Sequence, residues 1–219
     1  MLDRTDDISI ATENWLAQFE QALAESADVL LRSLFHADSY WRDVLALSWN
    51  LQTISGADAI LKELRLHAGR AAPGGFCIDP ERAAPRRVTR AGTHAIEAIF
   101  RFETAQGRGD GILRLTPDGS DDGKLKAWTL LTTLEELKGF EEPLGTARPR
   151  GSAYSRDFRG PNWLDLRKAA AQYADRDPAV LVIGGGQAGL CIAARLKQLQ
   201  VDTLIVDREA RIGDNWRRR

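Results

Sequence analysis

Hydrophobic positions near the N-terminus recur at helical spacing. Trp15, Phe19 and Leu23 follow one another every four residues. This period predicts a helix over residues 12–34, with a break near Glu25–Ala27. The apolar face points to burial against the rest of an N-terminal domain.

The next segment, 34–43, mixes aromatic and charged residues in a way that is unusual for a plain surface helix. Residues 49–53 are predicted to form a strand, and Ser55-Gly56 marks a turn. Residues 57–66 show helical spacing of apolar residues, so a short helix is expected there. From residue 73 to residue 87, glycine, proline and arginine interrupt any regular pattern.

Three strands are predicted after this interruption. Apolar and polar residues alternate over 96–103, which is typical of a half-buried strand. Residues 111–116 and 125–133 follow as two further strands, separated by turns at 106–109 and 117–123. Because the predicted helices come first and an antiparallel meander follows them, the sequence predicts an α+β domain.

A connector is expected between this domain and the C-terminal end of the chain. Asn162 is placed to cap a short helix over 163–173. The predicted organisation is an N-terminal domain over 1–142, a linker with this helix over 143–177, and a second domain beginning at 178.

The second domain opens on a strand followed by a glycine motif. Residues 180–183 are Val-Leu-Val-Ile, and Gly184, Gly186 and Gly189 then fit the spacing G-x-G-x-x-G. The first glycine permits the tight turn and the second lets a pyrophosphate approach the backbone. The third allows the helix to pack close to the strand. The phosphates would lie at a helix N-terminus, where N–H groups and the helix dipole favour negative charge.

The surroundings of this motif extend the pattern. Ala193 and Leu196 give the following helix a small apolar face, and residues 201–206 have the composition of a second strand. Asp207 ends that strand about 18 residues after Gly189, where an acidic residue receives the ribose hydroxyls of a dinucleotide. The pattern predicts a Rossmann βαβ unit; the alternative is a glycine-rich turn in another strand–helix unit.

Composition narrows the class of protein. The chain has 219 residues and a net charge of −1, so no nucleic-acid or membrane partner is expected. The N-terminus lacks the basic and apolar regions of a signal peptide, and no apolar run has the length of a membrane span. Cys77 and Cys191 lie in different parts of the chain, which predicts free thiols in a cytoplasmic protein. A buried position is expected for Cys191.

Several polar residues of the N-terminal domain are candidates to line a pocket. The strongest pair is Asp43 with Tyr40, because a carboxylate base and a hydroxyl donor suit isomerase chemistry. Their spacing would place them on one face of a helical turn. The alternative for this run is packing and salt bridging. The full candidate set is His36, Asp38, Tyr40, Asp43, His67 and His94.

Other chemistry finds less support in the sequence. The three histidines and two cysteines lack the spacing of metal ligands, so no metal is predicted. Four arginines of the connector are expected to be solvated linker charges, with contact to a cofactor phosphate as the alternative. They are Arg148, Arg150, Arg156 and Arg159.

The last 40 or so residues resemble the start of the FAD domain in flavin-containing monooxygenases. The resemblance rests on the glycine motif and on the turn Gly213-Asp-Asn-Trp216, where that family has a G-G-x-W-like turn. Asp214 replaces a second glycine, and Asp207 stands where glutamate is usual; both acids can accept ribose hydroxyls. The resemblance implies an FAD site formed by Gly184, Gly185, Gly186, Gln187, Ala188, Gly189, Asp207, Arg208, Asn215 and Trp216.

Residues 10–140 resemble a nuclear transport factor 2-like domain, the cone-shaped fold also found in ketosteroid isomerase. The order of helices and strands carries this resemblance. Such a domain precedes the flavin domain in a group of bacterial and fungal flavin monooxygenases. It implies a domain that holds a small ligand or forms a homodimer through its sheet.

Together the resemblances imply a monooxygenase that uses FAD and NADPH to insert oxygen into a small organic substrate. The chain would be an N-terminal fragment, because the second glycine motif, which binds NADPH, is absent. Catalytic residues are unknown. The chain alone is expected to bind FAD weakly or not at all. Two alternatives remain: a ligand-binding or dimerisation module with a vestigial dinucleotide motif, and a simple NAD(P) reductase.

Overall fold

The computed structural model describes residues 5–119, 123–145 and 160–218. The chain divides into two compact units, Met1–Gly139 and Phe140–Arg219. The predicted linker over 143–177 lies partly outside the described residues and stays a prediction.

The described residues of the N-terminal unit form three helices, α1 (Thr5–Ala24), α2 (Asp28–Ser33) and α3 (Ala57–Ala71). The predicted break is confirmed, because Ser26 between α1 and α2 has a φ of +53°, which an α-helix does not accommodate. The first helix begins seven residues before the predicted start. Thr12 therefore lies inside the helix, where its hydroxyl donates to the Ile8 carbonyl at 2.9 Å.

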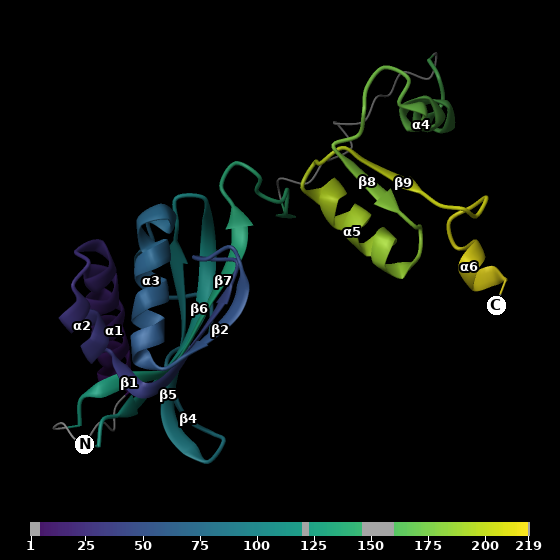
Figure 1. Cartoon of the computed structure of the whole chain (residues 1–219). Coiled ribbons are helices and arrows are strands. Elements are labelled where there is room, and N and C mark those ends of the chain that lie inside the picture. The colour runs from purple at the N-terminus through teal and green to yellow at the C-terminus, as the bar shows by residue number, and fades with distance from the viewer. Residues whose placement is uncertain (1–4, 120–122, 146–159, 219) are drawn as a thin grey trace. The chain divides into compact units, whose positions relative to one another are not determined.

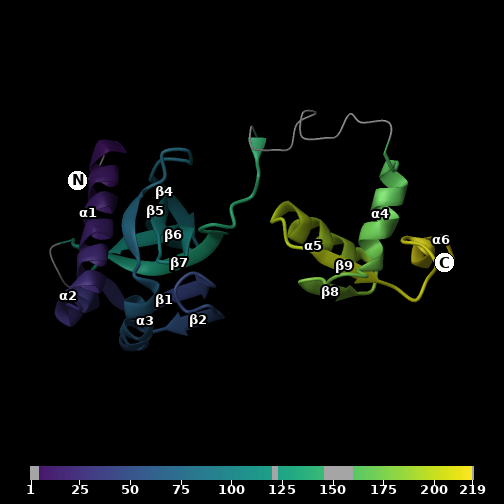
Figure 2. The same ribbon diagram turned by 90° about the horizontal axis from the view of Figure 1, so that it is seen from above.

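A seven-stranded sheet forms the other layer of this unit (Figures 1 and 2). Its strand order is β2-β1-β7-β6-β5-β3, and β4 pairs with β5. Among the described strand pairs of this sheet, β1 and β7 run parallel and the others are antiparallel. The strands are β1 (Phe35–Val44), β2 (Leu51–Ser55), β3 (Gly74–Ile78), β4 (Arg86–Arg90), β5 (Thr93–Glu103), β6 (Gly107–Pro117) and β7 (Leu125–Leu137).

The predicted meander is confirmed as β5, β6 and β7, so the α+β class holds for this unit. The turn expected at 106–109 is shorter, since Gly107 already belongs to β6. Three strands had no sequence prediction. Segment 34–43 lies in strand β1 from Phe35 onward, and core and solvent sides alternate there from Ser39 to Asp43. The interrupted region holds β3 and β4, whose pairing partner is β5.

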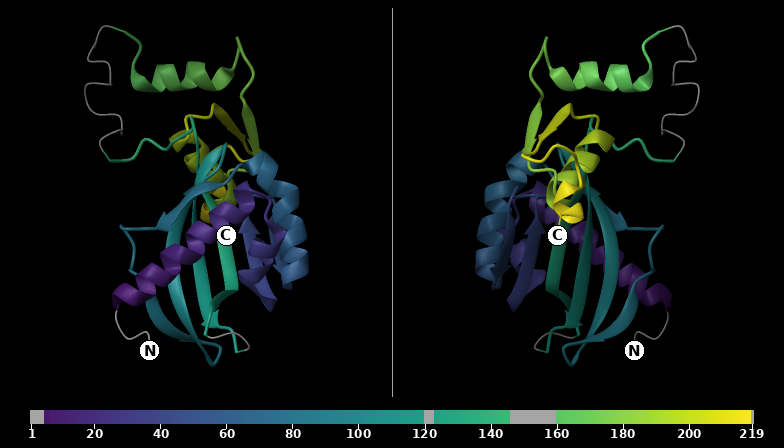
Figure 3. Two further views of the ribbon diagram at one scale, coloured as in Figure 1. Left: turned by 90° about the vertical axis from the view of Figure 1, so that its left-hand side faces the viewer. Right: turned by 90° about the vertical axis from the view of Figure 1, so that its right-hand side faces the viewer.

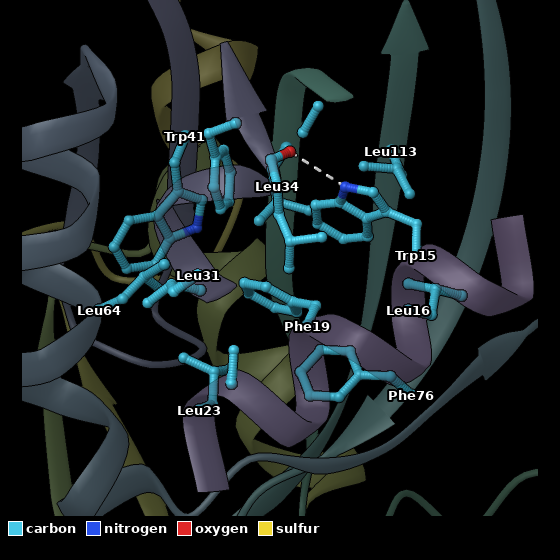
Figure 4. Close-up of a cluster of buried hydrophobic side chains, with 14 of the residues drawn as sticks. Trp15, Leu16, Phe19, Leu23, Leu31, Leu34, Trp41, Leu64, Phe76 and Leu113 are labelled. Atoms are coloured by element: carbon cyan, nitrogen blue, oxygen red, sulfur yellow. Dashed lines mark hydrogen bonds between the residues drawn. The ribbon is translucent and has the colours of Figure 1, made fainter. Parts of the chain in front are cut away.

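All three helices cover one face of the sheet, which we call the inner face, and α1 runs across its strands (Figure 3). Aromatic side chains fill the space between the layers (Figure 4). The Trp15 indole N–H donates to the Leu34 carbonyl at 3.1 Å, which satisfies the polar end of a buried ring. The buried aromatic residues are Trp15, Phe19, Phe35, Trp41, Phe76, Phe100 and Phe102.

Glu97 of β5 lies on the opposite, outer face of the sheet, where its side chain bonds to arginines of β4. Its side chain is only 8% exposed and accepts hydrogen bonds from three arginines, Arg86, Arg90 and Arg114. Burial alone would raise the pKa of Glu97, but the bonds from Arg90, Arg114 and Arg86 outweigh it. They lower the pKa from 4.5 to about 2. Glu97 therefore stays ionised over the physiological range.

We expect Glu97→Gln to reduce the free energy of unfolding by about 2 kcal/mol at pH 7, the scale of hydrogen bonds to a charged group. Because the folded-state pKa is depressed, this contribution is present above pH 4.5 and is lost as the pH falls toward 2. Urea unfolding of both proteins from pH 7 to pH 2.5 measures the difference. Glu103→Gln on the same strand, where Glu103 pairs with Lys138 near the surface, is the control. A Glu97→Gln deficit that stays constant with pH would contradict the assignment.

The C-terminal unit contains the predicted βαβ arrangement (Figure 1). Strands β8 (Val180–Ile183) and β9 (Thr203–Val206) pair in parallel and are connected by α5 (Gln187–Gln198). Helix α4 (Trp163–Gln172) precedes them. Its predicted cap is confirmed, since the Asn162 side chain accepts from the Asp165 N–H at 3.0 Å. The short helix α6 (Asp214–Arg217) follows β9.

Candidate functional site

The turn after β8 uses the first glycine of the motif. Gly184 has a φ of +101°, a conformation that side-chain-bearing residues rarely adopt. Its N–H donates to the Val206 carbonyl at 2.7 Å, so the turn is joined to the end of β9. The loop and the end of the second strand are thereby held together.

The third glycine allows the helix to approach the turn. A Cβ on Gly189 would lie 1.9 Å from the Gly184 carbonyl oxygen and 3.3 Å from a Val182 methyl carbon. No side chain fits there without moving the backbone. Ala193 and Leu196 are half-buried on α5, in agreement with a small apolar face toward the strands.

The second glycine lies at the start of α5. Gly186 is the N-cap residue, with extended backbone, and a Cβ there would lie 3.5 Å from the Asn215 side-chain nitrogen. The turn containing Asn215 is thus brought next to the glycine loop. The first N–H groups of an α-helix have no acceptor within the helix and carry the positive end of its dipole. An anion at this position would be stabilised by both.

Asp207 faces the loop from the end of β9. Its carboxylate accepts from the Glu209 N–H at 2.8 Å and from the Gly185 N–H at 2.5 Å. These two bonds lower its pKa, the one from Glu209 more strongly, so the group is ionised at neutral pH. A carboxylate has about four lone-pair sites, so acceptor capacity remains for ligand hydroxyls.

An open hollow of about 470 Å³ lies beside the loop. Four of the predicted residues contribute to its lining: Gly184, Asp207, Arg208 and Asn215. The other lining residues were not predicted, although they adjoin predicted residues in the sequence; they are Ile183, Val206 and Glu209.

Other predicted residues lie around this hollow without lining it. Gln187 and Ala188 are exposed in the first turn of α5. Trp216 is 45% exposed, and its described backbone bond is to Gly213 within its own turn, so its packing on a nucleotide stays a prediction. The expectation of a buried Cys191 is wrong, because that thiol is exposed on α5.

The structure gives a reason for Asp214, which replaces the expected glycine in the turn. Its side chain is buried and accepts from Arg217 at 2.7 Å. Gly213 before it has a φ of +89°, so the turn keeps one glycine where the backbone requires it. The carboxylate holds this turn together from within.

In the N-terminal unit, the predicted pairing of Tyr40 with Asp43 on a helical turn is wrong. Both residues lie in β1, where positions three apart point to opposite faces. Tyr40 is 46% exposed and Asp43 is fully buried. The two side chains therefore cannot act on one substrate.

Asp43 has a structural role. Its oxygens accept from the backbone N–H groups of Leu47 and Ser48, from the Ser48 hydroxyl, and from the Thr132 hydroxyl at 2.6 Å. Thr132 in turn accepts from the Trp41 indole N–H at 2.9 Å. The carboxylate thus fixes the loop after β1 to the middle of the sheet.

We expect Asp43→Ala to lower the free energy of unfolding by about 3 kcal/mol, because several buried donors lose their acceptor. Asp38→Ala, an exposed change on the same strand, should alter it by less than about 0.5 kcal/mol. Thermal or urea unfolding measures both. Equal stabilities of the two variants would contradict the structural role.

The remaining polar candidates do not converge. His36 bonds with Thr116, His67 lies 3.4 Å from Glu63 of its own helix, and His94 bonds with Thr89. Asp38 is exposed. Arg148, Arg150, Arg156 and Arg159 lie outside the described residues. Within the described ranges, no group of three histidine, cysteine or acidic side chains could hold a metal ion.

The part of the chain that the structure describes contains no helix with the length and hydrophobicity of a membrane span.

Residues 182–219 match the family model of an NAD(P)-binding Rossmann-like domain, and the matched region includes the glycine loop from Gly184 and Asp207. A search of curated proteins gave no match.

Solved structures with similarity to the chain include NTF2-like proteins and a protein with a cystatin-like fold. Nuclear transport factor 2 from Cryptosporidium parvum is 11% identical, with 61% of this chain and 96% of that chain covered and a TM-score of 0.40. An NTF2-like superfamily protein from Salmonella enterica is 10% identical, and the match covers 69% of this chain and 100% of that chain with a TM-score of 0.42. A protein with a cystatin-like fold from Nostoc punctiforme is 11% identical, and the match covers 61% of this chain and 94% of that chain with a TM-score of 0.42.

Proposed function

We propose that the C-terminal unit binds the ADP portion of FAD, as part of an FAD- and NADPH-dependent monooxygenase acting on a small organic substrate. The observation that carries the proposal is the glycine turn at the start of α5 with the Asp207 carboxylate facing it. The Rossmann-like match over residues 182–219 supports a dinucleotide-binding oxidoreductase in general. When bound, the flavin would supply the oxygen-insertion chemistry.

Each residue of the loop has a definite role in this proposal. The N–H groups of the first turn of α5 receive the diphosphate. Asp207 accepts hydrogen bonds from the adenosine ribose hydroxyls. Asn215, whose amide lies next to Gly186, donates to a diphosphate oxygen.

The charge of Asp207 favours FAD over NADPH at this loop. Its pKa is lowered, so the carboxylate is ionised and would repel a ribose 2′-phosphate. FAD and NAD have a free 2′-hydroxyl at that position, and this hydroxyl can donate a hydrogen bond to the carboxylate. The turn containing Asn215 then favours FAD by its resemblance to flavin-containing monooxygenases.

Competition binding tests the proposal. With ADP as the reference ligand at millimolar concentration, FAD should displace it at a concentration at least tenfold lower than NADP⁺. Asp207→Asn should weaken ADP binding about tenfold, the scale of hydrogen bonds to a charged group. Asp177→Asn, an exposed change before β8, is the matched control. Tighter binding of NADP⁺ than of FAD would favour a nicotinamide reductase instead.

A further inference from the structure

The outer face of the sheet in the N-terminal unit carries a cluster of arginines around Glu97. Arg114 of β6 and Arg86 of β4 each lie directly opposite Glu97 in the strand register, one on either side. Arg90 joins them from the end of β4. Helices α1, α2 and α3 pack on the other face, so none of the helices that the structure describes in this unit covers the cluster (Figure 1).

One carboxylate holds all three guanidinium groups. Arg90 donates to both Glu97 oxygens, at 3.0 Å and 3.2 Å. Arg114 donates through Nε, at 2.9 Å, to one oxygen, and Arg86 donates through Nη2, at 3.1 Å, to the other. The shared acceptor fixes the three groups close together, although like charges repel one another.

The arrangement leaves positive charge at the surface. Three guanidinium groups and one carboxylate give the cluster a net charge of +2. Glu97 is 8% exposed, whereas the arginine side chains are 28% to 55% exposed. The negative charge therefore lies beneath and the positive charges face solvent.

Donors remain after the bonds to Glu97. A guanidinium has five N–H groups, and Arg86 directs only Nη2 to the carboxylate. Thr129 of β7 lies directly opposite Arg114 in the strand register, and its hydroxyl is a further hydrogen-bonding group beside the cluster. Asp110, the next acidic residue along β6, lies four residues from Arg114, on the order of 13 Å away.

We infer that this three-arginine cluster binds a tetrahedral dianion, inorganic phosphate or a phosphate monoester. Guanidinium groups match the geometry of phosphate oxygens through paired N–H donors, and a charge of −2 balances the net +2 of the cluster. Because Glu97 already orders the arginines, little side-chain entropy is lost on binding. The inference concerns the N-terminal unit and is independent of the dinucleotide loop.

Titration of the full chain with inorganic phosphate tests this inference. In low-salt buffer, the arginine Nε–H NMR signals of Arg86, Arg90 and Arg114 should shift with saturation. Acetate, a monoanion, should leave them unchanged at the same concentrations. Methyl phosphate in parallel separates an esterified from a free source: binding as tight as inorganic phosphate or tighter indicates a monoester.

A matched pair of variants checks that the cluster is responsible. Arg86→Gln should weaken phosphate binding at least fivefold and is expected to fold, because Arg86 is exposed and makes one bond to Glu97. Arg32→Gln removes an exposed arginine paired one-to-one with Asp58 and should have no effect. Unshifted arginine signals, shifts confined to the amides of 184–189, or equal phosphate binding by Arg86→Gln and the parent would each overturn the inference.

Discussion

Substitution of Gly111 by alanine should destabilise the N-terminal unit by about 3 kcal/mol, at the upper end of overpacking effects. A Cβ at this position would lie 2.1 Å from the Phe100 ring and 2.4 Å from the Leu131 carbonyl oxygen. The ring belongs to the buried aromatic cluster and the carbonyl to the paired strand β7, so neither can move freely. Urea unfolding followed by tryptophan fluorescence measures the effect.

Gly119→Ala is the control for this change. Gly119 follows β6, and a Cβ there would meet no heavy atom within 4 Å. Its stability should stay within about 0.5 kcal/mol of the parent. If Gly111→Ala were as stable as Gly119→Ala, the close approach of Phe100 to β6 would be wrong.

Substitution of Gly189 by alanine should reduce ADP binding at least tenfold. The new Cβ would lie 1.9 Å from the Gly184 carbonyl oxygen, so α5 must move away from the turn. That movement displaces the N–H groups that receive the diphosphate, because they belong to the same end of the helix. Isothermal titration at millimolar ADP measures the loss.

Gly69→Ala is the matched control, since Gly69 lies in helix α3 and a Cβ there meets nothing within 4 Å. It should leave ADP binding unchanged and stabilise its helix by about 0.5–1 kcal/mol. Undiminished ADP binding by Gly189→Ala would show that the tight helix–turn contact is not needed for the ligand.

Periodic patterns predicted much of the fold because burial on one face imposes a repeat on the sequence. The spacing of Trp15, Phe19 and Leu23 predicted α1, and the alternation over 96–103 predicted β5. The glycine motif predicted the turn before α5, because a φ of +101° at Gly184 and the contact at Gly189 leave glycine as the residue that fits.

The strands that the sequence did not predict are those whose place in the sheet is decided by pairing over long range. Strand β1 is parallel to β7, about 90 residues away, and its mixed side chains gave no local sign of this. Asp43 was therefore expected beside Tyr40, although it bonds to Thr132 of the distant strand. Strand β4 is likewise defined by its antiparallel pairing with β5, in which Arg86 lies opposite Glu97.

If the loop 184–189 receives a diphosphate, NMR titration of the ¹⁵N-labelled chain with ADP should detect the ligand at the loop itself. We expect the amide signals of residues 185–189 and of Asp207 to shift together. Adenosine, which lacks the diphosphate, should shift the signals of residues 185–189 far less. Unchanged loop signals at saturating ADP, or equal shifts with adenosine, would contradict the claim.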